Sequence, residues 1–234
     1  MKKSKKFAAV ALSAALIATL AIGGTYAWLS HKTDTKENVF TMGSGLTGEL
    51  NEPKWDDTGK QDATNYTPGK VIAKDPQITN TSATTTDPAY VGITITYEVT
   101  TDGGKTYTPT TYDALDKFVD VEHYVGTALA EGFNTDKWTF NQDNTLGYLN
   151  TTLAAQATSP TVFDAVKIDP LALTAEQITT NQYTASLYTG KTVADYEMKN
   201  FRITVTGYLV QSTDSGTALA ALQTAFPSVF VPFV

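Results

Sequence analysis

The clearest pattern of hydrophobic and polar positions lies in two segments far apart in the chain, residues 90–99 and 201–210. In both, apolar side chains occupy every second position, and threonine or a charged residue fills most positions between them. Successive side chains of a strand point to opposite faces of a sheet, so each segment is predicted to be a strand with one buried face. The residues predicted to share these buried faces are Val91, Ile93, Ile95, Tyr97 and Val99 in the first and Phe201, Ile203, Val205 and Leu209 in the second.

Shorter strands are predicted at residues 75–80 and 161–168. After the first long strand, residues 102–104 read Asp-Gly-Gly and predict a turn, with Tyr107 on a partner strand. The polar stretch 51–69 is predicted to be a loop. A further strand is predicted from apolar residues at even spacing, Phe40, Met42, Leu46 and Leu50.

Helical spacing is found in only a few places. Residues 112–120 carry one apolar stripe and residues 217–226 another, and Pro227 ends the second. Thr174 and Gln177 have the spacing of a capping box and predict the start of a short helix. Strands separated by Gly, Pro, Asn and Asp turns, without a βαβ rhythm, predict an all-β, mainly antiparallel β-sandwich with a few short helices.

The N-terminus has the features of a secretory signal peptide. Four lysines within residues 1–6 precede the uncharged segment 7–22, and the sequence Gly-Gly-Thr-Tyr-Ala follows. Ala27 offers the small side chain that a signal peptidase requires, so cleavage is predicted between Ala27 and Trp28. Residues 1–27 are therefore interpreted as the signal peptide. Residues 28–234 contain no long linker or repeat and are predicted to form one domain.

A retained membrane anchor is the alternative for this segment. The uncharged stretch from Phe7 to Leu29 is long enough to cross a bilayer, which takes about 20 residues. The Gly-Gly pair and Thr25 weaken its last turn, and the flank after Leu29 lacks stop-transfer character. Cleavage is the preferred interpretation.

Composition narrows the class of protein. The formal net charge is −7, and loss of the four lysines of the signal peptide would lower it to −11. Nucleic-acid binding requires a basic surface, so this partner class is not expected. The chain has no cysteine and hence neither disulfides nor thiolate metal ligands. Its 41 threonines favour strands over helices.

Several motifs, taken in order, resemble the TasA/camelysin family of exported Gram-positive proteins. The segment GGTYAWLSHKTDTKENVFTMGSGL resembles the start of that family, with Phe40-Thr-Met-Gly43 and then Leu46 as its first strand pattern. Pro68-Gly69, Asn80 and Tyr90-Val91 match later turn and strand motifs. Trp138, Thr161-Val-Phe163, the segment FRITVTGYLVQS and Phe226-Pro227 complete the series.

The resemblance implies a jelly-roll-like sandwich, cleavage by a signal peptidase of the SipW type, and assembly into fibres of the biofilm matrix. In the TasA branch, it further implies insertion of the mature N-terminal strand into a neighbouring subunit. The corresponding assembly residues here are Trp28, Leu29, Val39 and Phe40.

Physical chemistry makes this exchange reasonable for Trp28–Val39. These twelve residues would span about 40 Å when extended. The segment is apolar at its ends and polar between them, and an extended segment gains backbone hydrogen bonds by adding to an open sheet edge. A head-to-tail contact of this kind does not close and so propagates as a filament. The alternatives are a frayed terminus or a strand that packs on its own sheet.

Residues suited to chemistry are few. His31 and His123 lack the His-Glu-x-x-His spacing of a zinc protease helix, and Gly43-Ser44-Gly45 is too short for a nucleophile elbow. Residues 141–144 and the Asp56-Asp57 pair lack the complete calcium-loop pattern. No catalytic, metal or cofactor residue is therefore predicted. The resemblance to camelysin nevertheless makes a secreted metal-dependent protease the main alternative.

Residues 226–234 form an apolar C-terminus interrupted by two prolines. It is too short to span a bilayer and is expected to cover part of its own domain. Together these features predict a non-enzymatic structural protein, secreted to the matrix or cell surface. Its predicted partners are further copies of itself, a signal peptidase and other matrix proteins, with no membrane span after cleavage. A monomeric surface adhesin is a third possibility.

Overall fold

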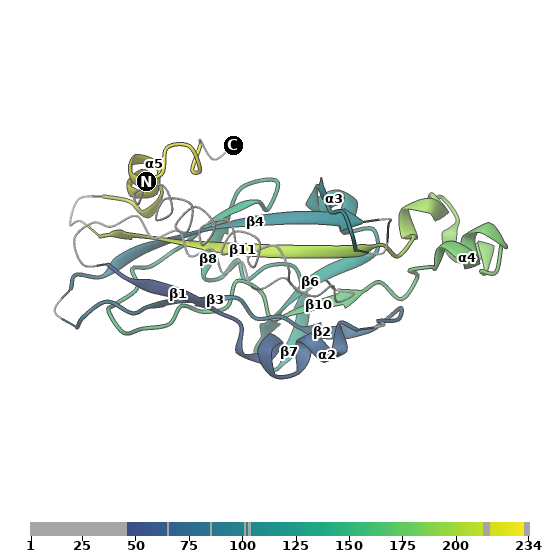
Figure 1. Cartoon of the computed structure of the whole chain (residues 1–234), viewed down its shortest axis with the longest axis horizontal. Helices are drawn as coiled ribbons and strands as arrows, with labels where there is room; N and C mark the ends of the chain where they lie inside the picture. Colours follow the sequence, from purple (N-terminus) through teal and green to yellow (C-terminus); the bar gives the residue numbers. More distant parts are fainter. Residues whose placement is uncertain are drawn as a thin grey trace, which may run out of the picture.

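The structure is a computed structural model that describes residues 46–64, 66–84, 86–100, 102, 104–212 and 216–231. Two sheets with purely antiparallel pairing dominate it (Figure 1). The larger sheet has the order β11-β4-β9-β8, and β5 pairs with the far end of β4. Its strands are β4 (Ala89–Thr100), β5 (Thr108–Thr110), β8 (Trp138–Phe140), β9 (Leu146–Leu149) and β11 (Asn200–Gln211).

The second sheet has the order β2-β10-β6-β7. A two-stranded ribbon, β1 with β3, packs against β11 of the larger sheet, where the Ile78 side chain approaches Gly207. The outer edge of β3 bonds to the segment around Ser159, whose side chain accepts the Ile78 N–H at 2.9 Å. The strands of this layer are β1 (Gly48–Asn51), β2 (Val71–Ala73), β3 (Gln77–Asn80), β6 (Val119–Val125), β7 (Ala128–Glu131) and β10 (Ala165–Ile168).

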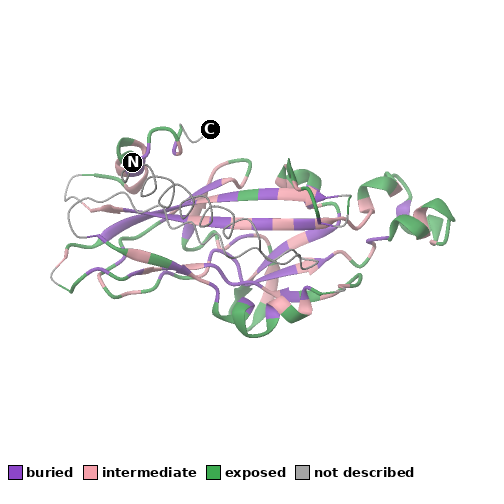
Figure 2. Cartoon of the chain, viewed as in Figure 1, coloured by how far each residue is buried: buried purple, intermediate pink, exposed green. Residues whose placement is uncertain are grey.

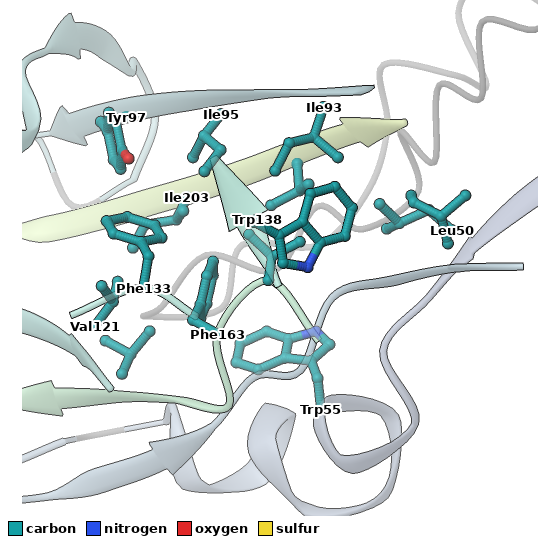
Figure 3. Packing of buried hydrophobic residues seen from close by; sticks show 14 of the residues in the cluster. Leu50, Trp55, Ile93, Ile95, Tyr97, Val121, Phe133, Trp138, Phe163 and Ile203 are labelled. Carbon is teal, nitrogen blue, oxygen red and sulfur yellow. The ribbon is translucent and has the colours of Figure 1, made fainter. Parts of the chain in front are cut away.

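One hydrophobic core fills the space between the sheets (Figure 3). Ile93 and Ile95 of the larger sheet and Val121 of the second point into it, with Phe133 and Phe163 between them. The rings of Phe133 and Phe163 meet edge to face at 5.8 Å. The architecture is therefore an all-β, antiparallel sandwich, as the alternation predicted.

The two long strands follow the predicted alternation closely. Figure 2 shows buried and more exposed positions alternating along most of β11 and along the second half of β4, whereas residues 89–93 of β4 are all buried. The inward residues of β4 from Val91 to Tyr97 are at most 2% exposed. Val99, at the end of the series, is only partly buried but still packs against the core.

Helical segments are short, as expected. Thr174 and Gln177 form the predicted capping box at the start of α4, and the Thr217 side chain accepts the Ala220 N–H at the start of α5. Among the described residues, none of the helices has the length and apolar character needed to cross a membrane. The helical elements are η1 (Trp55–Gly59), α2 (Lys60–Asp62), α3 (Tyr112–Leu115), α4 (Ala175–Thr179), η2 (Ala185–Tyr188), η3 (Val193–Tyr196) and α5 (Ala218–Ala225).

Three local predictions need correction. The stretch 51–69 is not simply a loop, since η1 and α2 form there around the buried Trp55. The helix predicted at 112–120 ends at Leu115, and strand β6 has already begun at Val119. The strand predicted at 161–168 is formed only from Ala165 onward, although Phe163 is fully buried.

The C-terminal segment covers the outer face of the larger sheet. Leu222 and Phe230 pack with Tyr208 of β11 in a small second cluster. Gly92 of β4 makes this possible, because a Cβ at that position would lie 2.4 Å from the ring of Phe230. The described part of the apolar C-terminus thus packs on its own sheet, as expected.

Candidate functional site

The residues predicted to carry processing and assembly lie outside the described part of the chain. This applies to Ala27 and Trp28 at the cleavage site, and to Leu29, Val39 and Phe40 of the assembly segment. His31 and Gly43-Ser44-Gly45 also lie there. A functional site in the described residues must therefore be sought in the sandwich itself.

Strand β11 forms one edge of the larger sheet over twelve residues. Its pairing with β4 runs without a bulge from Asn200 opposite Thr100 to Gln211 opposite Ala89. Ser212 N–H continues the same register and donates to the Pro88 carbonyl at 2.8 Å. Bonded and non-bonded pairs alternate in an antiparallel ladder, so the even-numbered residues of β11 bond to β4.

The backbone N–H and C=O groups of the odd-numbered residues consequently point away from β4. From Phe201 to Gln211, these outward groups make no hydrogen bond within the described part of the chain. The side chains of most of these odd residues, Val205 among them, are buried in the core. The open edge of β11, defined as residues 201–211, therefore presents backbone with the side chains turned inward.

The open edge of β11 has a defined beginning. The Tyr66 hydroxyl donates to the Lys199 carbonyl at 2.7 Å, and the Tyr66 ring packs edge to face on Phe201 at 5.9 Å. This bond satisfies the last outward carbonyl before the open edge. An added strand would thus meet Tyr66 at one end.

Natural sheet edges are commonly protected by charges, prolines, bulges or shortness. The open edge of β11 has none of these features except one charge, Arg202. That guanidinium reaches back to Glu98 of β4, with an Nη2–Oε2 distance of 2.5 Å, and lies 4.6 Å from the centre of the Tyr107 ring. By contrast, β2, β5 and β8 are only three residues long, β5 contains Pro109, and the four-residue β7 ends in Glu131.

His123, the described histidine weighed for a zinc site, and its neighbour Glu122 both make contacts within the fold. His123 lies on strand β6, where its Nδ1 donates to the Gly132 carbonyl at 3.0 Å. Its neighbour Glu122 is buried and pairs with Lys167 at 3.1 Å. Glu122 therefore joins β6 to β10, and His123 joins β6 to the residue that follows β7.

The two loosely calcium-like segments are also parts of the framework. Asn141 Oδ1 accepts the N–H groups of Thr145 and Leu146 at 2.9 and 2.8 Å and closes the β8–β9 turn. Asp56 forms an i,i+4 ion pair with Lys60 at 2.7 Å in the η1–α2 segment. Within the described residues, no group of three or more His, Cys, Asp or Glu side chains could hold a metal ion.

A buried polar group was missed by the sequence analysis. Lys74 Nζ lies 2.9 and 3.0 Å from the two carboxylate oxygens of Glu52 and 5.0 Å from the centre of the Trp55 ring. Asp75 accepts the backbone N–H groups of Lys54 and Trp55 at 2.9 and 3.3 Å. Burial raises the pKa of Asp75 in spite of these bonds. The group fixes η1 against the sandwich.

A second polar group lies on β6 and β7 and on the residues that directly follow α3 and β10. Burial raises the pKa of Asp120 to about 6, with further increases from Glu131, Asp116 and Asp169, while Lys167 opposes them. The pKa of Asp116 is also raised, mainly by burial, against a hydrogen bond from Tyr112 that lowers it. The carboxylates near the β7 edge therefore repel one another at neutral pH.

Comparisons with known proteins bear on this arrangement. A family model described as camelysin metallo-endopeptidase matches residues 2–127, which is more than half of the chain. The match runs through strand β6 and includes the residues predicted to be processed. Neither the curated proteins nor the solved structures gave a match. The extent of the family match shows that the chain belongs to the camelysin metallo-endopeptidase family.

Proposed function

We propose that this protein is an exported structural subunit that assembles head-to-tail into extracellular fibres. In this proposal, cleavage after Ala27 gives a chain that begins at Trp28. Residues 28–39 then add as a strand to a sheet edge of the next subunit. Membership of the camelysin family supports export of the chain.

The proposal is carried by a contrast between two features of the sandwich. Its side chains suited to chemistry are engaged in structural contacts, whereas one edge of its larger sheet is unpaired in the described part of the chain. His123, Glu122 and Asn141, the described residues best suited to chemistry, are engaged in contacts that maintain the fold. The larger sheet, however, ends in a long strand with unbonded backbone groups. Such an edge gains hydrogen bonds when an extended segment pairs with it.

Cleavage would act as the switch for assembly. Before cleavage, Trp28 is tied to the membrane-inserting segment, so residues 28–39 cannot reach a neighbour freely. After cleavage, the same residues become a free N-terminal segment whose backbone gains bonds by pairing. One subunit then offers a strand and an edge at different places, so the contact is heterologous and does not close.

The test compares the processed protein with a deletion variant that lacks residues 28–39. The processed protein is expected to form filaments visible by electron microscopy, and the deletion variant is expected to remain a folded monomer by circular dichroism and light scattering. Normal filaments from the deletion variant would refute the proposal. N-terminal sequencing checks the processing step, and a secreted chain that begins at Met1 or Ser4 would contradict it.

A metal-dependent protease is the second candidate, because the matched family is described as a metallo-endopeptidase. It predicts casein cleavage that a chelator abolishes and that is lost when His31 and His123 are both replaced by alanine. Chelator-sensitive cleavage that survives both replacements would contradict a histidine-ligated zinc site. The fibre proposal predicts filament formation that is unchanged by the chelator.

A further inference from the structure

We infer that the open edge of β11 is the site that receives the N-terminal strand of a second copy, and that this strand runs antiparallel to β11. The inference rests on the proposed function and deepens it by assigning the acceptor, the direction and the approximate register. Its first support is a comparison of the sheet edges. Among the described strands, every other strand at the edge of a sheet (β1, β2, β3, β5, β7 and β8) is only three or four residues long, whereas β11 contains twelve.

The lengths of donor and acceptor correspond. The segment Trp28–Val39 contains twelve residues, and β11 contains twelve. At about 3.4 Å per residue, both extend about 40 Å. Tyr66 occupies the outward carbonyl of Lys199, so the donor is confined to the stretch from Phe201 onward. A twelve-residue donor therefore fills the open edge of β11 and leaves little of it exposed.

The direction follows from where the chain enters the sandwich. β1 begins at the end of the molecule where β4 begins and β11 ends, and α4 lies at the opposite end (Figure 1). Thr47, just before β1, accordingly bonds to Ser82, which precedes the start of β4. A donor that leaves its own subunit at this end reaches a neighbour beyond it along the long axis.

In that arrangement, Val39 lies closest to its own subunit and therefore enters the neighbour at the α4 end of the neighbour's β11, near Phe201. Trp28 then lies near Gln211. β11 itself runs from the α4 end to the opposite end (Figure 1), so the donor is antiparallel to it. This direction agrees with the antiparallel pairing of every strand pair in the described sheets.

The alternation of bonded and non-bonded pairs along β11 determines which of its side chains lie next to the donor strand. The outward backbone belongs to odd-numbered residues, so the even-numbered residues form the non-bonded pairs with the donor. In such pairs the Cα atoms are about 4.5 Å apart, within the range that a disulfide bridges. Thr204 and Thr206 are even-numbered, partly exposed and on the face opposite the core. Antiparallel pairing of residues 28–39 with 212–201 places Lys36 opposite Thr204 and Asp34 opposite Thr206.

Disulfide mapping tests this arrangement cleanly, because the chain contains no cysteine. One processed protein carries a single cysteine at one of the positions from Ser30 to Asn38, and a second carries Thr204→Cys or Thr206→Cys. The two are mixed, assembled and oxidised, and the linked pairs are identified by mass spectrometry. The matched control is Thr139→Cys on β8, the opposite edge of the same sheet.

The expected result is a linkage between different chains that is strongest near position 36 for Thr204→Cys. The strongest position should move towards the N-terminus, to about 34, for Thr206→Cys. The yield should exceed that of the Thr139→Cys control roughly tenfold, because paired strands hold the thiols at high effective concentration. A shift in the other direction would show parallel pairing and overturn the assigned direction.

Two further outcomes would overturn the assigned acceptor. Filaments whose linkages form with Thr139→Cys but not with Thr204→Cys or Thr206→Cys would place the donor on another edge. Disulfides found only within single chains, in diluted protein that carries both cysteines, would show that the segment occupies its own β11 edge. If the unmodified processed protein forms no filaments, the proposed function itself fails, and this result is distinct from a misplaced acceptor.

Discussion

Strands β4 and β11 are alike in length and in the pattern of their apolar and polar positions, and yet they differ in what surrounds them. Both contain twelve residues, both alternate apolar and polar positions, and they pair with each other along their whole length. β4 also pairs with β9 and β5 on its other side, whereas β11 has no partner on its other side in the described part of the chain. Alternation therefore determines which face of a strand is buried, but not whether the strand lies inside a sheet or at its edge.

The largest expected effect comes from placing proline in each strand at paired positions. Ile95 and Val205 lie opposite each other and both point into the core. Ile95 N–H donates to the Thr145 carbonyl at 2.8 Å, whereas Val205 N–H points to the open edge. Ile95→Pro should reduce the free energy of unfolding by about 4 kcal/mol or more, and Val205→Pro by about 2 kcal/mol, as measured by urea denaturation.

The alanine variants Ile95→Ala and Val205→Ala serve as controls for the lost side-chain volume. Val205→Ala keeps the outward N–H and should still form filaments, while Val205→Pro should fold but fail to assemble. Equal destabilisation by the two prolines, after correction by the alanine controls, would contradict the distinction between an interior and an edge strand.

The next effect concerns the segment that covers both strands at one end. The side chain of Phe230 is only 1% exposed, and its ring meets Tyr208 of β11 edge to face at 5.4 Å, directly above Gly92 of β4. Phe230→Ala should cost about 3 kcal/mol of stability, since it leaves a cavity between α5 and the sheet. Thermal denaturation measures the loss. Filament formation below the lowered melting temperature should persist, because the open edge of β11 is untouched, and its loss would implicate the covered face in assembly.

The sequence predicted local structure well where a short pattern determines it. The buried face of β4 follows from its alternation, and the capping box at Thr174 follows from a hydroxyl and an amide three residues apart. Trp55 shows where this reasoning fails. Surrounded by charged residues, it gives no periodic signal, but its side chain is buried. Lys74 and Asp75 come from elsewhere in the chain, and they pair with the nearby Glu52 and accept the Trp55 N–H, respectively.

The candidate site was predictable only in part, because strand order is a non-local property. Residues 200–211 contain neither a proline nor an unpaired charge, the usual marks of an edge strand. Their sequence therefore does not show that this strand lies at an edge. Phe163 illustrates the same limit. It is buried outside any strand, because the Asp164 side chain accepts the Tyr124 N–H at 2.8 Å and turns the chain just before β10. The contact between Asp164 and Tyr124 spans forty residues of sequence, and the pairing of β11 with β4 spans at least one hundred.

A smaller effect is expected at β6 and β7, the interior and edge strands of the second sheet. The pKa of Asp120 is raised to about 6 from 3.8 by burial and by repulsion from Glu131, Asp116 and Asp169. Between these two values the unfolded chain loses the proton first, so stability falls as the pH rises through this range. Asp120→Asn should therefore stabilise the protein at pH 7 by about 1 kcal/mol, a value reduced for the half-exposed position, and should give no gain below about pH 4.

Urea denaturation across the range from pH 4 to pH 8 measures this dependence. Glu131→Gln, on the edge strand, removes one repulsive neighbour and should shift the transition in the stability profile towards lower pH. A gain for Asp120→Asn that is the same at pH 4 and pH 7 would contradict the electrostatic cause. The result also shows how strongly charge repulsion acts at the edge strand β7, where it disfavours the addition of another strand, in contrast to the open edge of β11.

The smallest effect is expected for the ion pair that joins the two compared strands. Arg202 of β11 and Glu98 of β4 lie directly opposite each other and are about one quarter and one fifth exposed. A double-mutant cycle with Arg202→Ala and Glu98→Ala should give a coupling energy of at most about 1 kcal/mol, and it should decrease with added salt. The backbone ladder and the buried face, not this pair, then hold β11 to β4. A coupling energy of several kcal/mol that persists in high salt would mean that the ion pair contributes strongly to the pairing of β11 with β4. Replacement of Arg202 would then destabilise the strand that is inferred to receive the donor.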